Sequence, residues 1–105
     1  MKKTAIMIMG SKWKVVLLDP DKFHKDHQDC EAVCYPDECQ IFFQVGRTDM
    51  LTIIHEVTHA FYKYQAITDD NYLKNEQHEE FMCTFFGKFG EEIIKIAKQL
   101  KRRLK

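Results

Sequence analysis

The chain has 105 residues, a length that fits a single domain spanning residues 1–105 with one modest core. Sixteen basic and sixteen acidic side chains cancel, so composition gives no general argument for a nucleic-acid or anionic-membrane partner. Basic residues do crowd the tail at 95–105, where we expect a solvated helix end that complements the helix dipole. Because no apolar run is long enough for a secretory signal or a membrane span, we expect a cytoplasmic protein.

Four cysteines are present, and three of them fall close together in the first half of the chain. Their spacing lacks the paired Cys-x2-Cys arrangement of structural zinc sites. In a reducing cytosol such residues are expected to be free thiols rather than disulfides or a second metal site. The four are Cys30, Cys34, Cys39 and Cys83.

The first half of the sequence predicts two hairpins. Residues 5–9 and 12–18 are apolar runs joined by a turn at Gly10 and Ser11. The polar stretch 20–29 is expected to be a loop or a single helical turn. Residues 31–35 and 39–44 form the second expected hairpin, with its turn at Pro36. We expect an edge strand at residues 41–44, where a substrate can add as a further strand.

The second half predicts helices. Thr48 or Asp49 can cap a helix that ends near residues 64–67. A second helical region is expected over about residues 74–103, which Gly87 and Gly90 can bend or break. Strands first and helices last favour an α+β fold. The first helix carries apolar residues at helical spacing that should be buried: Met50, Ile54, Val57, Phe61 and Tyr64.

An HExxH motif lies in the middle of the first predicted helix. His55 and His59 are four residues apart, so they share a face and can bind one zinc ion. Both should border the buried stripe rather than face open water. Glu56 lies beside the ion and can act as general base, because zinc lowers the pKa of a water molecule to about 7.

A catalytic zinc needs a third protein ligand, which we expect from the second helix. The candidates there are Glu76, His78, Glu79 and Glu80. We favour Glu80, because small residues follow it at the next turns and would let the two helices approach closely. Glu79 is the alternative and leads into a bulkier strip. The small residues are Cys83, Thr84 and Gly87.

Residues 52–61 resemble the active-site helix of small prokaryotic and phage-encoded zincins, most closely the ImmA/IrrE-type peptidases and more loosely SprT-like proteins. Residues 80–87 are similar to the family's second element, to which Glu80, Thr84 and Gly87 correspond. The resemblance implies a minimal zincin-like fold, in which a small antiparallel or mixed sheet packs on the HExxH helix and a C-terminal helical segment. It also implies that the edge strand lies along the substrate.

These observations predict a zinc metallopeptidase that hydrolyses a peptide bond in a specific protein substrate, such as a regulator. Glu56 would take a proton from water and pass it to the leaving amine. The alternative is a catalytically inactive, metal-stabilised protein-binding module, for example an accessory protein of a phage or mobile element. A nucleic-acid accessory role for the tail at 95–105 is a further rival. Candidates for an additional transition-state group are Tyr62, Tyr64 and Tyr72.

Overall fold

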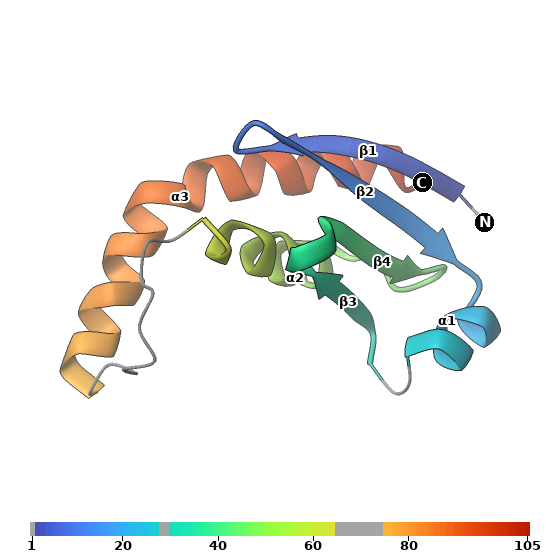
Figure 1. Ribbon diagram of the computed structural model, residues 1–105, viewed down its shortest axis with the longest axis horizontal. Helices are drawn as coiled ribbons and strands as arrows, with labels where there is room; N and C mark the ends of the chain where they lie inside the picture. The colour runs from blue at the N-terminus through green and yellow to red at the C-terminus, as the bar shows by residue number, and fades with distance from the viewer. Residues whose placement is uncertain (1, 28–29, 65–74) are drawn as a thin grey trace.

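Two apolar strands open the chain in the computed structural model, which describes residues 2–27, 30–64 and 75–105, and only the backbone of 75–79 (Figure 1). β1 (Lys2–Ile8) pairs antiparallel with β2 (Ser11–Leu18), as the sequence predicts. The two turn residues are Met9 and Gly10, with φ of 51° and 82°, rather than the predicted Gly10 and Ser11, because Ser11 already pairs with Ile8 as the first residue of β2. Positive φ at both positions is typical of the tight turn that matches the twist of a hairpin.

A short helix, α1 (Pro20–His27), follows β2 where a loop or a single turn was expected. Pro20 suits the first helical position, because the amide hydrogen that proline lacks would have no partner there. Phe23 is the one buried residue of α1, and it packs with Val16 and Leu18 of β2. With a single apolar anchor, α1 has no periodic stripe from which the sequence could predict it.

The second predicted hairpin is confirmed. β3 (Ala32–Tyr35) and β4 (Gln40–Gln44) pair antiparallel around a 3-10 turn, η1 (Pro36–Glu38). β4 also pairs parallel with β2, so the sheet is mixed and its strand order is β1-β2-β4-β3. The expectation of an edge strand at residues 41–44 is therefore wrong. β4 lies inside the sheet, and the two edge strands are β1 and β3.

Two helices cover one face of the sheet, and α1 packs on the other (Figure 1). α2 (Met50–Tyr62) ends slightly before the predicted limit, and α3 (Asn75–Arg103) continues through Gly87 and Gly90 without a break while curving along its length. The α+β class is thus confirmed. None of the helices in the described ranges has the length and apolar character needed to cross a bilayer.

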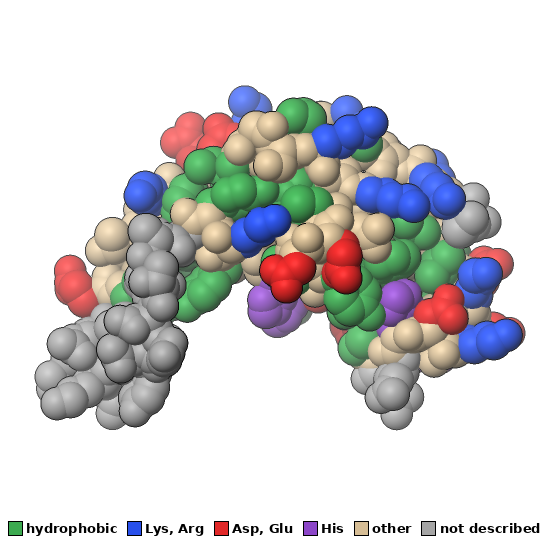
Figure 2. Space-filling model, viewed as in Figure 1, with side chains coloured by type: hydrophobic (Ala, Val, Ile, Leu, Met, Phe, Trp, Pro, Cys, Tyr) green, Lys and Arg blue, Asp and Glu red, His purple; other side chains and the backbone are tan. Residues whose placement is uncertain are grey.

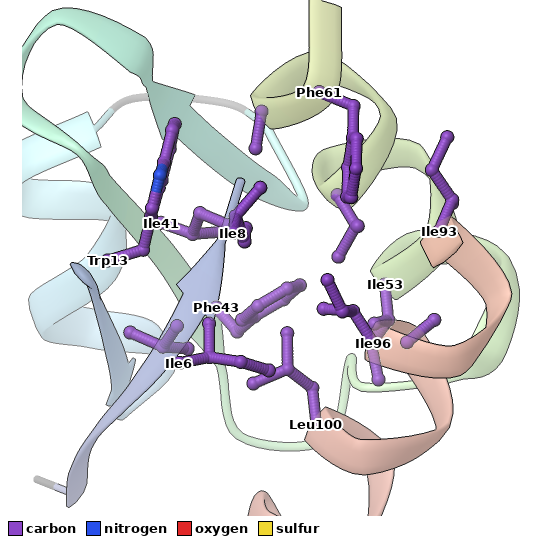
Figure 3. Packing of buried hydrophobic residues seen from close by; sticks show 14 of the residues in the cluster. Ile6, Ile8, Trp13, Ile41, Phe43, Ile53, Phe61, Ile93, Ile96 and Leu100 are labelled. Carbon is purple, nitrogen blue, oxygen red and sulfur yellow. The ribbon is translucent and has the colours of Figure 1, made fainter. Parts of the chain in front are cut away.

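The main core lies between the sheet and α2 with α3. Figure 3 shows Phe43 of β4 pointing into the space between the strands and the helices, toward Ile53 of α2 and Ile96 of α3. The Trp13 indole, also fully buried, donates a hydrogen bond of 3.0 Å to the Tyr64 hydroxyl, which joins β2 to the segment after α2. This packing fixes α2, and with it the HExxH motif, against the sheet.

Candidate metal site

The N-terminus of α2 is fixed by Asp49. Its carboxylate accepts a hydrogen bond from the Thr52 amide at 3.2 Å and from the Thr52 hydroxyl at 2.8 Å. These bonds lower the pKa of Asp49. Of the two caps that the sequence allows, Asp49 is the one observed. The helix therefore begins at Met50.

The buried face of α2 is centred on Ile53, Val57 and Ala60, all fully buried, together with Phe61. Of the predicted stripe, Val57 and Phe61 are buried, whereas the three other members are only partly so. The predicted stripe was therefore rotated by part of a turn. The partly buried members are Met50, Ile54 and Tyr64.

His55 and His59 lie on the side of α2 away from the sheet. Both are exposed, and the His55 side chain is 65% exposed, so the expectation that they avoid open water is wrong. Their Nε2 atoms are 3.2 Å apart. Two nitrogen ligands at about 2.05 Å from a tetrahedral zinc ion would be about 3.3 Å apart, so the pair fits two positions of such a site.

The His59 imidazole is also suited electronically to bind a cation. Burial, followed by the neighbouring His55, lowers the pKa of His59. A lowered pKa keeps the ring neutral at physiological pH, and a neutral ring has the lone pair that a metal ligand needs. Thr58, between the histidines, donates its hydroxyl hydrogen to the Ile54 carbonyl at 2.7 Å, so it does not compete for them.

Glu56 lies beside the histidine pair but is nearly buried, with a relative exposure of 6%. Its Oε2 is 3.9 Å from the His55 Nε2, a distance too long for a hydrogen bond. Burial raises the pKa of Glu56, and the positive form of His55 partly opposes that rise. The pKa of the Glu56 carboxyl group is therefore closer to neutral pH than that of an ordinary glutamate, as a general base requires.

Cys34 of β3 is a neighbour of Glu56 that the sequence did not suggest. Burial, then the negative charge of Glu56, then Cys39, raise the pKa of the Cys34 thiol to about 12. Its thiol therefore stays protonated at neutral pH. All four cysteines are free in the structure. The alternation of β3 could have placed Cys34 on the covered face, but no local signal pairs β3 with α2.

Two hollows meet at Leu51 and His55, which line both. The larger, of about 470 Å³, is apolar apart from the histidines and Thr58. The smaller, of about 290 Å³, reaches Glu56 and the chain leading into β3 at residues 30–32. The site is thus an open trough across α2. The other residues of the larger hollow are Ile54, His59, Tyr62 and Phe86.

The packing argument for Glu80 as third ligand is wrong. Thr84 and Gly87 are exposed, and a Cβ built on Gly87 would meet nothing within 4 Å, so the small strip does not contact α2. Aromatic rings form the contact instead: Tyr62 packs on Phe81 and Phe85 with centroids 5.9 and 5.8 Å apart. This face was missed because exposed and buried aromatic residues alternate along this part of α3.

Glu80 itself is exposed, and the structure does not group it with the histidines. Among the side chains described, no three of His, Cys, Asp and Glu lie together in a way that could hold a metal ion. The other candidates, Glu76, His78 and Glu79, have side chains outside the described part. Of the candidate site residues, the structure therefore brings together His55 and His59, with Glu56 next to them.

The other residues singled out from the sequence have separate roles. The Tyr64 hydroxyl is occupied by Trp13, whereas Tyr62 lines the larger hollow next to the histidines. Tyr72 lies outside the described residues. His27 Nδ1 is 2.8 Å from the Tyr35 hydroxyl on the other side of the sheet. Of the tyrosines described, Tyr62 is the one that lines the hollow beside the histidines.

Comparison with known proteins adds no assignment to this geometry. A scan against models of known protein families gives no match, and searches of curated proteins and of solved structures give no significant similarity. What the chain does must therefore be argued from the HExxH helix and its surroundings.

Proposed function

We propose that this protein is a zinc-dependent peptidase of minimal zincin-like fold, in which His55 and His59 bind the metal and Glu56 is the general base. The observation that carries the proposal is the 3.2 Å separation of the two Nε2 atoms on one exposed helix face. A bound zinc ion would supply Lewis-acid polarisation of a carbonyl group and a water molecule of lowered pKa.

The residues of this chain would handle the proton. Burial raises the pKa of Glu56, so its carboxylate can accept a proton from water and then protonate the leaving amine. Glu56 lies next to the histidine pair, with 3.9 Å between its Oε2 and the His55 Nε2. A small rotation or the entry of one water molecule would bring the carboxylate into reach of the reacting group.

For the third ligand, the hollow beside the histidines shifts our preference to Glu79. Phe86 of α3 lines that hollow together with His55 and His59. Position 79 precedes Phe86 by seven residues, which is two helical turns, so both lie on one face of α3. Position 80 shares its face with the exposed Thr84. Glu80 remains the alternative.

The substrate we propose is an extended peptide with a large apolar side chain next to the cleaved bond. The hollow of about 470 Å³ offers apolar walls from Leu51, Ile54 and Phe86 and carries no acidic or basic side chain other than the histidines. β3, rather than β4, is the edge strand beside α2, so it would be the strand that pairs with the peptide backbone.

Metal content and turnover test the proposal together. Purified protein should hold about one zinc per chain, and His55→Ala with His59→Ala should abolish it. Glu56→Gln should keep the zinc but lower turnover of a cleavable partner by two to four powers of ten. Glu31→Gln, which makes the same change at another residue of the smaller hollow, is the matched control and should keep near-normal turnover. Full zinc in the double variant would refute the metal site.

A second function is favoured by one observation, the near-complete burial of Glu56. A carboxyl group that is shielded from solvent suits a metal-stabilised module that binds a partner and cuts nothing. In that case Glu56→Gln would keep both partner binding and the full biological effect. The same variant therefore separates the two functions.

A further inference from the structure

Although the net charge is zero, basic and acidic side chains are distributed unevenly along the chain. Residues 1–18 and 93–105 together contain ten basic side chains and no acidic one. Residues 19–92 contain the other six basic side chains and all sixteen acidic ones. The two acid-free segments lie at opposite ends of the sequence, so only the fold can decide whether they form one surface.

The fold places these two segments side by side (Figure 1). Lys2 Nζ donates a hydrogen bond of 2.8 Å to the Lys105 carbonyl. The Arg103 guanidinium donates to the Ala5 carbonyl on the outer edge of β1. Two cationic side chains thus attach the end of the chain after α3 and the last turn of α3 to β1.

The outer face of the β1–β2 hairpin carries one part of the charge. Ile6, Ile8 and Trp13 point to the core, so alternation turns Lys3, Lys12 and Lys14 to the other face. All three lysines are exposed. Exposed lysines on an edge hairpin also protect it against pairing with another chain, so this part alone would not indicate a ligand.

The last turns of α3 carry the second part. Lys95, Lys98, Arg102 and Lys105 follow one another at spacings of three and four residues, and all are exposed, so they form one stripe. Glu91 precedes Lys95 on the same line and ends the stripe. From Lys95 to Arg102, the part of the stripe that lies within α3, the stripe is about 10 Å long at the rise of an α-helix, the axial length of about three base pairs of DNA.

A hollow joins the two parts. It has a volume of about 230 Å³ and lies between β1 and α3, where Lys12, Gln99 and Arg103 supply its polar groups and Met7 part of its apolar wall. Two cations and an amide around one depression are donors suited to phosphate oxygens. In Figure 2, several Lys and Arg side chains lie in the upper half of the molecule, where Figure 1 shows β1 and β2, whereas the visible histidines lie in the lower half.

We propose that this surface, made of the β1–β2 hairpin and the last turns of α3, binds the phosphate backbone of double-stranded DNA without reading its sequence. Single-stranded nucleic acid is held by exposed aromatic rings on which bases stack. In the parts of β1, β2 and 93–105 that the structure describes, the one aromatic residue is Trp13, and it is fully buried. The DNA surface is separate from the metal site and does not depend on it.

Binding of a labelled 20-base-pair duplex, followed by fluorescence anisotropy across salt concentrations, tests the proposal. With five phosphate contacts, one each from Lys12, Lys14, Lys95, Lys98 and Arg102, the slope of log K against log salt should be about −4.5, so affinity should fall about 500-fold between 50 and 200 mM salt. Lys95→Gln, Lys98→Gln and Arg102→Gln together should reduce the slope by up to about 2.7. Lys12→Gln with Lys14→Gln should reduce it by up to about 1.8.

A matched control removes three positive charges elsewhere. The control variant combines Lys22→Gln, Lys25→Gln and Lys88→Gln, at exposed positions in the acidic part of the chain. It should leave the slope of log K against log salt unchanged. All substituted side chains are exposed, and circular dichroism will verify the fold of each variant. His55→Ala with His59→Ala should bind DNA as the wild type does.

Three results would overturn the proposal. One is the absence of salt-dependent binding by the wild-type protein, including the case in which it binds only phosphatidylserine vesicles or an acidic protein. Another is an equal loss of affinity in the control triple variant, which would mean that net charge alone acts. The third is an unchanged slope in the hairpin variant, which would mean that α3 acts without β1 and β2.

Discussion

Replacing His55 and His59 with alanine should remove zinc-dependent stabilisation while leaving the metal-free fold intact. Both side chains are exposed, and their described ring contact is with each other. Surface substitutions of this kind change the free energy of unfolding by about 0.5 kcal/mol or less. For 105 residues the unfolding entropy is about 0.22 kcal/mol/K, so the metal-free Tm should shift by about 2 °C at most.

The zinc-bound wild type should behave differently. A ligand at 100 times its Kd stabilises the folded state by about 2.7 kcal/mol if it binds the folded state alone. At the same unfolding entropy, this corresponds to a rise in Tm of about 12 °C. The contrast between about 12 °C and about 2 °C is large enough to be unambiguous in a single thermal melt.

The assay is thermal unfolding followed by circular dichroism, with excess chelator and then with titrated zinc. His24→Ala is the matched control, because His24 is an exposed histidine of α1 and the variant should keep the full zinc-induced shift. A double variant that still gains about 12 °C would place the metal elsewhere, for example at the cysteines. A double variant that already melts far lower in chelator would make the histidines structural.

Three further predictions concern the third ligand, the core and the helix cap. Glu79→Ala should raise the zinc Kd at least tenfold in a chelator competition, whereas Glu80→Ala should change it less than threefold; the reverse order would restore Glu80. Phe43→Ala leaves a cavity at a fully buried site between the sheet and the helices. The free energy of unfolding, measured with urea, should therefore fall by about 3–5 kcal/mol, and a decrease below 1 kcal/mol would contradict the packing. Because Thr52 lowers the pKa of Asp49, the stability that this cap gives is present at neutral pH and is lost as pH falls below the ordinary carboxyl range. The Tm of wild type should therefore exceed that of Asp49→Ala by a few degrees at pH 7 and converge with it near pH 2; a constant difference would show that ionisation is irrelevant.

Features set by neighbouring residues were predictable from the sequence. The start of α2, with its cap at Thr48 or Asp49, and the shared face of His55 and His59 depend on spacings within one or two helical turns, although only the structure identifies Asp49 as the cap. Both hairpins were predictable for the same reason, because turn residues and alternation are local.

Features set by distant residues were not predictable. The parallel pairing of β2 with β4 depends on α1, which a single buried residue, Phe23, holds in place. Because β4 pairs with β2 on one side and β3 on the other, β4 is not the edge strand that the sequence predicted, and β3 lies at that edge instead. Likewise, small residues at Thr84 and Gly87 suggested a close helix contact, but the tertiary packing of Phe85 and Phe89 turned them to solvent. Spacing gives the faces of a helix, but not which neighbour each face will meet.

The rate at which a thiol reagent labels the half-buried Cys34, beside Glu56, can report on local motion around the candidate site. Thiolate, not thiol, reacts with alkylating and disulfide reagents, and at a pKa of about 12 only about one Cys34 in 100,000 is ionised at pH 7. Exposed Cys83 should therefore be labelled first. Labelling of Cys34 should be slower, and a zinc ion that restricts the movement of α2 against β3 should slow it further.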